Sequence, residues 1–147
     1  MSHDELLATL EDADASGVFH LPLRDAEAIR RAAASAGLAC FDVSLEDCSS
    51  LDEVLGRLGH DLDFPDWYGH NLDALKDCLT DFSWAEAAGY VLIIVHAEGL
   101  LAHDPAALAV LTEVFVEAIA EWRSQGYPMW IFLDVPAAGL AIFATTA

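Results

Sequence analysis

The fold of this chain is decided by residues 65–80, which read PDWYGHNLDALKDCLT. The stretch predicts a turn that runs into a helix. Gly69 allows the sharp turn, and Asn71 is a good N-cap because its side-chain oxygen can accept a hydrogen bond from an orphan backbone N–H. Apolar residues then recur at the spacing of a buried helix face. The inward positions are Leu72, Leu75, Cys78, Leu79 and Phe82.

The opposite side of this predicted helix carries acids four residues apart, at Asp73, Asp77 and Asp81. Like charges at this spacing repel by roughly 0.2–0.5 kcal/mol per pair, and only Asp73 lies near the positive helix N-terminus. A solvated acidic face is one interpretation. The aromatic pair Trp67 and Tyr68, one turn upstream, favours another, because large amphipathic side chains beside fixed charges are typical of protein interfaces. The stretch therefore predicts a recognition surface.

Residues 65–80 resemble the signature of the barstar-like family, whose prototype is an intracellular inhibitor of the secreted ribonuclease barnase. The shared pattern is free of gaps: Pro-x-aromatic-Tyr-Gly-x-Asn-Leu-Asp-Ala-Leu-x-Asp-Cys-Leu-Thr. Residues 114–118, followed by Gly126 and the apolar run 129–133, resemble the last helix and last strand of the family. Together the matches cover residues 40–135. The resemblance implies a ribonuclease inhibitor that binds its target and catalyses nothing.

The resemblance also implies which residues contact the partner. Two aspartates, Asp73 and Asp77, would enter the cationic cleft of the nuclease, where the scissile phosphate would otherwise lie, and Asp77 would contribute most. Aromatic anchors, the helix cap and an acid on a later helix would surround them. These further partner-binding positions are Trp67, Tyr68, Asn71 and Glu117.

Four positions depart from the family pattern, and one of them, Trp67 in place of a tyrosine, is a tolerable change. Lys76 stands where the prototype presents a tryptophan to the enzyme, and it brings positive charge next to Asp77, where it could pair with Asp73 or with an acid on the partner. His70 replaces an acid, and Tyr127 replaces a cysteine. We expect these changes to preserve the fold and to alter the target. The partner then need not be barnase: it is another basic ribonuclease, or the nuclease domain of a toxin for which this chain is the immunity protein.

The net charge of −19 is a second strong signal, because six Lys and Arg face twenty-five Asp and Glu. Nucleic-acid binding depends largely on cation–phosphate contacts, so this charge excludes direct binding to nucleic acid and disfavours anionic membranes. The charge would instead attract a strongly basic protein and speed its capture. Solubility alone is the competing explanation of the acidity.

Several features predict a cytoplasmic protein. Cys40, Cys48 and Cys78 are odd in number and show no C-x-x-C spacing, which favours reduced thiols. The acidic start of the chain lacks the basic region of a secretory signal, and no apolar run reaches the ~18–20 residues needed to cross a bilayer. With 55% apolar residues, we expect one globular domain, monomeric, with an extension at 1–39, a barstar-like core at 40–135 and a tail at 136–147.

Strand and helix patterns alternate along the chain, which predicts an α/β fold. The expected strands are 18–21, 38–45, 90–95 and 129–133. The expected helices are a short acidic one whose capping box is Ser2 and Glu5, and then 25–36, 51–58, 72–79 and 108–122. The resemblance implies a three-stranded parallel sheet covered by helices, to which the N-terminal strand and helix add a fourth βα unit. The tail from Ala137 to Ala147 is expected to be disordered or to form an extra edge segment.

Catalytic and metal-binding alternatives have weaker support. His70, Asp73 and Asp77 share a helical face, and three donors lie upstream at His60, Asp61 and Asp63, but neither set matches a strong metal motif such as H-E-x-x-H. Cys78 is on the leucine face, and no nucleophile elbow or glycine-rich phosphate loop is present. We therefore expect no enzyme, cofactor or metal, while a metal-dependent hydrolase and a non-inhibitory interaction domain remain the rival hypotheses.

Overall fold

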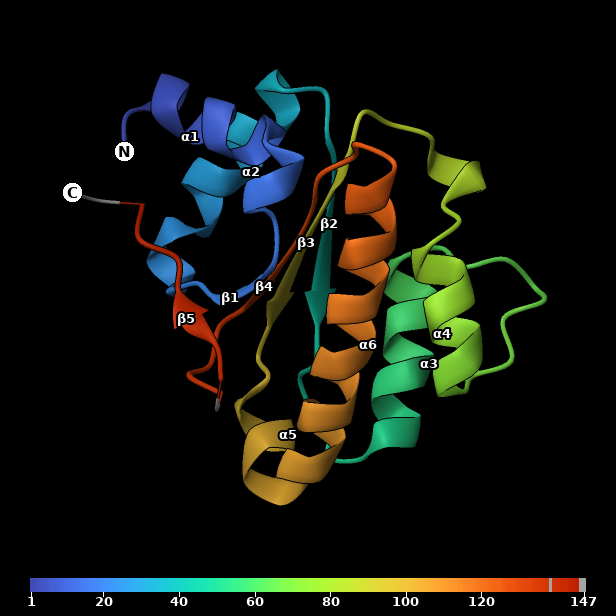
Figure 1. Cartoon of the computed structure of the whole chain (residues 1–147). Helices are drawn as coiled ribbons and strands as arrows, with labels where there is room; N and C mark the ends of the chain where they lie inside the picture. The colour runs from blue at the N-terminus through green and yellow to red at the C-terminus, as the bar shows by residue number, and fades with distance from the viewer. Residues whose placement is uncertain (138, 146–147) are drawn as a thin grey trace.

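The computed structural model describes residues 1–137 and 139–145. Its centre is a five-stranded sheet flanked by helices (Figure 1). The strands are β1 (Val18–His20), β2 (Ala39–Ser44), β3 (Tyr90–Val95), β4 (Met129–Leu133) and β5 (Ala141–Ile142). Their order is β2-β3-β4-β1-β5, and all neighbouring pairs are parallel. The α/β class and the parallel sheet expected from the sequence are confirmed, with five strands in place of three to four.

The N-terminal strand lies inside the sheet. β1 pairs with β4 through Val18 and Ile131, and on its other side it pairs with β5 through Phe19 and Ala141. The tail thus forms an edge segment at Ala141–Ile142, which was one of the two expected outcomes. Because β5 follows β4 in sequence but lies beyond β1 in space, the tail covers the strand that the N-terminal unit adds. A strand of two residues is too short to show an alternating apolar pattern, so the pattern alone does not predict β5.

The central strands β3 and β4 are continuous apolar runs because helices cover both of their faces. One face, with Val91, Ile93, Trp130 and Phe132, packs against the N-terminal helices. The alternate residues form the larger core on the other face: Leu92, Ile94, Ile131 and Leu133. The period of two along each strand therefore separates two cores.

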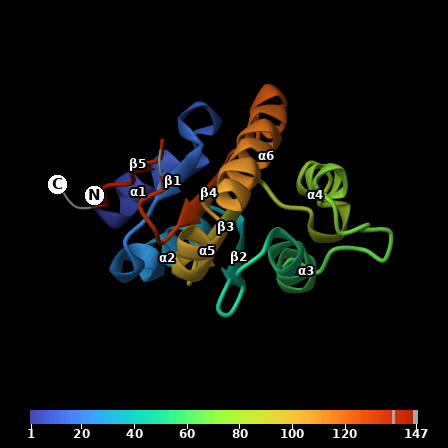
Figure 2. The ribbon, with the colours of Figure 1, turned by 90° about the horizontal axis from the view of Figure 1, so that it is seen from below.

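Helices cover both faces of the sheet (Figures 1 and 2). The N-terminal pair is α1 (His3–Glu11) and α2 (Ala26–Ser35); the larger core is covered by α3 (Leu51–Asp61), α4 (Leu72–Leu79) and α6 (Pro105–Ser124). Between β3 and α6 lies a short helix that the sequence did not predict, α5 (Glu98–His103). The described part of the chain also contains 3₁₀ turns at Ala13–Ala15, Leu23–Asp25 and Ser83–Ala85.

The helix ends follow the expected cap chemistry. Ser2 and Glu5 form the predicted capping box on α1. Gly37, which follows Ala36, the C-cap of the helix that the sequence predicts at 25–36, has φ +74°, a left-handed conformation that favours glycine and ends the helix. Asp104 caps α6, and Pro105 occupies its first turn. No helix in the described part of the chain is long and apolar enough to cross a membrane.

Candidate partner-binding surface

Helix α4 has one side locked into the core and one side open to solvent. Leu75, Cys78 and Leu79 are fully buried. Asp73 and Asp77 are exposed on the opposite side. The predicted division of the helix into an apolar and an acidic side is confirmed, so the two aspartates are free of any folding role that the core imposes.

The start of α4 is fixed by its cap. Asn71 accepts a hydrogen bond from the backbone N–H of Ala74 at 2.8 Å, as the sequence predicts. The sharp turn before the cap is made by His70, whose φ is +54°, and not by Gly69, which has an ordinary φ. His70 is exposed, and its ring lies 4.7 Å from that of Tyr68, measured between centroids. The capped turn holds the acidic side of α4 in a defined orientation.

Asp81, the third acid of the predicted acidic side, lies beyond the C-terminal end of α4. The helix stops at Leu79, and Asp81 follows it, where its carboxylate accepts a hydrogen bond from the N–H of Ser83 at 3.3 Å. Repulsion between like charges on the helix is therefore limited to Asp73 and Asp77.

A hydrogen bond joins the C-terminal end of α4 to α6. The indole N–H of Trp122 in α6 donates to the carbonyl of Leu79 at 2.7 Å, which satisfies a carbonyl that has no partner within its own helix.

The two aromatic residues before the helix have different environments. Trp67 is 55% exposed, as an interface anchor requires. Tyr68 is 7% exposed, and its hydroxyl donates to the carbonyl of Leu55 in α3 at 2.9 Å. A Cβ on Gly59 would lie 2.7 Å from the Tyr68 ring, so the ring fits against the bare backbone of α3. The expectation that Tyr68 offers apolar anchorage is thus corrected: the residue supports the turn from inside.

Lys76 forms an ion pair within the chain. Its Nζ lies 3.3 Å from Glu117 Oε2 on α6, so neither of the expected partners, Asp73 or an acid of another protein, is needed to explain it. Both side chains remain about half exposed. An exposed pair of this kind contributes ~0–1 kcal/mol to stability. The main effect of the pair is on the local charge, because Glu117 balances the positive charge that Lys76 places beside Asp77.

A shallow hollow of about 470 Å³ adjoins the acidic residues between the first turns of α3 and α4. Its walls combine apolar and acidic groups with an imidazole and the capping amide. The lining residues are Leu51, Asp52, Leu55, His70, Asn71, Leu72 and Asp73. The hollow could receive a side chain of a docked protein.

The same region lacks the chemistry of a reactive cysteine. Burial raises the pKa of the Cys78 thiol to about 11, with a smaller contribution from Asp81 and Asp77. The thiol therefore stays protonated near neutral pH and is a poor nucleophile. All three cysteines are free, as the sequence predicts. The two donor sets weighed as alternative metal sites, around His70 and around His60, form no cluster of three donor atoms in the described part of the chain.

Comparison with known proteins identifies the family. A family model described as "Barstar (barnase inhibitor)" matches residues 38–134. This match covers more than half of the chain, and the chain belongs to the barstar family.

Two further similarities are more limited. A protein of Bacillus subtilis (strain 168), named "Putative ribonuclease inhibitor YrdF", is 53% identical over 34 residues, which are 23% of this chain and 37% of that protein. The match thus spans little more than a third of that relative's length. A chain in the structure of Drosophila ORC bound to AT-rich DNA and Cdc6 is 11% identical, with a TM-score of 0.46 over 89% of this chain and 46% of that chain. This structural similarity is too low to support any argument about function.

Two features of the surface were missed by reasoning from the sequence. Val116, next to Glu117 on α6, is 53% exposed. It belongs to the apolar run Val114–Phe115–Val116, and nothing in its residue type indicates that it faces solvent. The pairing of Lys76 with Glu117 joins distant parts of the chain, and no local spacing indicates it. Only the packing of α4 against α6 brings these residues together.

Proposed function

We propose that this chain is a proteinaceous inhibitor of a ribonuclease, and that it acts by placing the exposed side of α4 in the enzyme's cationic RNA-binding cleft. One observation carries the proposal: Asp73 and Asp77 project from a helix whose other side is fully buried. Membership of a family described as barnase inhibitors supports it, as does the name of the Bacillus relative. A nuclease must be basic where RNA lies, so fixed carboxylates can occupy that place.

The surface is organised before any partner arrives. The Asn71 cap, the buried Tyr68 hydroxyl and the Trp122 indole hold the two ends of the turn and helix. Binding then costs little ordering entropy at the central acids, which favours affinity. The net charge of −19 steers a basic partner toward the chain. In this mechanism Trp67 supplies apolar contact, while Lys76 and Glu117 lie at the rim.

The residues outside the family match have a separate role in the proposal. Residues 1–39 extend a barstar-like core with α1, β1 and α2, and the tail adds β5, so β1 and β5 continue the sheet beyond β4. Helices α1 and α2 pack against the face of the sheet that carries Trp130 and Phe132, whereas Val18, Ala137 and Leu140 pack against the larger core. The α1–α2 layer leaves the acidic side of α4 open, so a monomer can bind its partner without it.

Lys76 favours a second candidate for the target. A lysine next to Asp77 adds positive charge close to a cleft that is already cationic, and like charges brought together at an interface can cost several kcal/mol. The chain is then the immunity protein of a nuclease toxin whose cleft offers an acid or an apolar surface opposite Lys76. The mechanism of occlusion is the same for both targets.

Titration of nuclease activity tests the proposal. Barnase and a panel of other basic ribonucleases and toxin nuclease domains are assayed with the wild-type chain, Asp77→Ala and the control Glu11→Ala. Glu11 is an exposed acid at the end of α1, so both variants remove one charge. We expect inhibition of at least one nuclease, a loss of at least about 2 kcal/mol in binding for Asp77→Ala, and little change for Glu11→Ala. Equal losses in both variants, or inhibition of none of the nucleases, would contradict the proposal.

A further inference from the structure

Three metal-binding side chains meet at the carboxyl edge of the sheet, away from the candidate surface on α4. His96 and Glu98 follow β3, and Asp134 follows β4. Since β3 and β4 are parallel neighbours, the ends of both strands reach the same edge. One donor atom from each residue lies within 4.8 Å of the other two, and no second group of this kind occurs among residues 1–137 and 139–145. In open α/β sheets this edge is where ligands bind.

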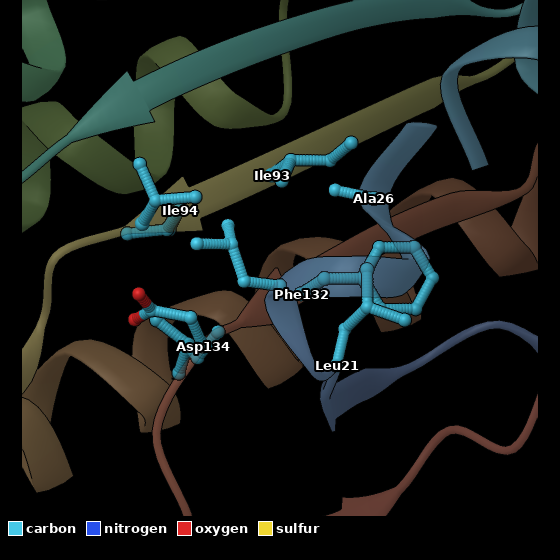
Figure 3. A pocket seen from close by; sticks show the side chains of 9 residues that line it. Leu21, Ala26, Ile93, Ile94, Phe132 and Asp134 are labelled. Carbon is cyan, nitrogen blue, oxygen red and sulfur yellow. The ribbon is translucent and has the colours of Figure 1, made fainter. Parts of the chain in front are cut away.

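Asp134 is held in place by the backbone. Its two carboxylate oxygens accept hydrogen bonds from the N–H of His96 at 2.7 Å and of Ala97 at 3.2 Å. Figure 3 shows Asp134 on the Ile94 side of an apolar crevice, with its oxygens pointing away from Leu21 and Ala26. Each oxygen keeps a free lone pair, because a carboxylate offers about four acceptor sites. A hydrogen-bonded carboxylate of this kind is typical of metal ligands.

The other two donors are already close to each other and are free to adjust. His96 Nδ1 lies 3.8 Å from Glu98 Oε1, and their side chains are 46% and 69% exposed. Bonds of about 2.0–2.2 Å to a tetrahedral ion place its ligand atoms about 3.4 Å apart. Rotation of these two partly exposed side chains can close the remaining gap.

A hollow of about 420 Å³ beside the cluster gives access to solvent. His96 and Glu98 line it together with two further acids, Glu46 and Asp47, which make its potential favourable to cations. Cys48 also lines the hollow, but it is only 3% exposed and packs in the larger core. The hollow therefore leaves room for water as a fourth ligand.

We propose that His96, Glu98 and Asp134 bind a Zn²⁺ ion at the carboxyl edge of the sheet. Two carboxylates balance the charge of a divalent cation, and the imidazole favours Zn²⁺ over Mg²⁺ and Ca²⁺, which prefer oxygen ligands. This site differs from both metal sets considered in the sequence and replaces the expectation of no metal. It shares no residue with the surface proposed to bind the nuclease, so either proposal can fail without the other.

Isothermal titration calorimetry of the full chain with ZnCl₂ at constant ionic strength tests the site. The ligand variants are His96→Asn, which tolerates the φ of +58° at this position, and Glu98→Gln. The matched control is His60→Gln, because His60 Nδ1 lies 3.0 Å from Asp61 Oδ1 but has no third donor. We expect saturable binding of one Zn²⁺, at least tenfold weaker in both ligand variants and unchanged in the control.

Competition and a spectrum complete the test. Excess MgCl₂ and CaCl₂ should leave Zn²⁺ binding unchanged, and Co²⁺ in place of Zn²⁺ should give visible absorption bands that Glu98→Gln weakens. Glu98 is 69% exposed, so this variant is expected to fold even if His96→Asn does not. No saturable Zn²⁺ binding, equal losses in the His60 control, or full affinity in Glu98→Gln would each overturn the proposal.

Discussion

Replacing Tyr68 with phenylalanine separates support of the turn from contact with a partner. The change removes only the hydroxyl that donates to the Leu55 carbonyl at 2.9 Å. Leu55 lies inside α3, where its carbonyl can also accept the usual helical hydrogen bond, so the buried oxygen is not left without a partner. The net loss is then that of one hydrogen bond, about 1 kcal/mol.

The assay combines unfolding with binding. For a chain of this length, a loss of about 1 kcal/mol lowers the melting temperature by about 2–4 °C. We expect Tyr68→Phe to show this shift while nuclease affinity stays within about 0.5 kcal/mol of wild type, because the ring and the turn are retained. Trp67→Ala should show the opposite pattern, since its side chain is 55% exposed: little change in stability and weaker binding by at least about 1 kcal/mol. A tenfold loss of affinity in Tyr68→Phe at unchanged stability would refute the assignment of Tyr68 to the interior.

Three further predictions concern packing, titration and specificity. Gly59→Ala should destabilise the fold by about 1–3 kcal/mol in urea unfolding, because the new methyl would lie 2.7 Å from the Tyr68 ring. The control Gly56→Ala should not destabilise the fold, because its methyl would meet nothing within 4 Å. Equal effects of the two variants would contradict the packing of Tyr68 against Gly59. Folding raises the pKa of Cys78 from 9.0 to about 11, so its contribution to stability is complete below pH 9 and is lost as the pH rises toward 11. Urea unfolding across this range should show a smaller alkaline decline in Cys78→Ala, and rapid labelling of Cys78 by a thiol reagent in the native protein would count against its burial. Lys76→Trp should improve inhibition of barnase and weaken inhibition of the true target, and titrating the activity of each enzyme measures both effects. Stoichiometric inhibition of barnase by the wild type at nanomolar concentration would show that Lys76 does not set specificity.

Much of the fold could be predicted because its elements carry strong local patterns. The apolar runs Tyr90–Val95 and Met129–Leu133 are strands with the expected bounds, since burial on both faces leaves no polar position within them. The long helix extends beyond its predicted range, to Pro105–Ser124, and its start depends on a proline and a capping aspartate, not on apolar spacing. The position of β1 within the sheet depends on pairing between distant segments, and no local pattern specifies such a partner.

The site shows the same contrast between local and distant information. The Asn71 cap and the buried side of α4 follow from neighbouring residues, and both were predicted. The burial of Tyr68 depends on the absence of a side chain at Gly59, and the charge of Lys76 is balanced by Glu117. These contacts join residues from different helices, so the sequence could identify the residues but not their environments.

A crystal structure of the complex with a nuclease that the chain inhibits would show whether α4 occludes the enzyme. We expect Asp77 to lie in the catalytic cleft, with its carboxylate about 2.7–2.9 Å from a lysine or arginine nitrogen of the enzyme. Asp73 and Trp67 should be covered by the enzyme, and α1 and α2 should remain in solvent. A nuclease bound instead to the α1–α2 layer or to the β5 edge, with its cleft open to RNA, would contradict the account.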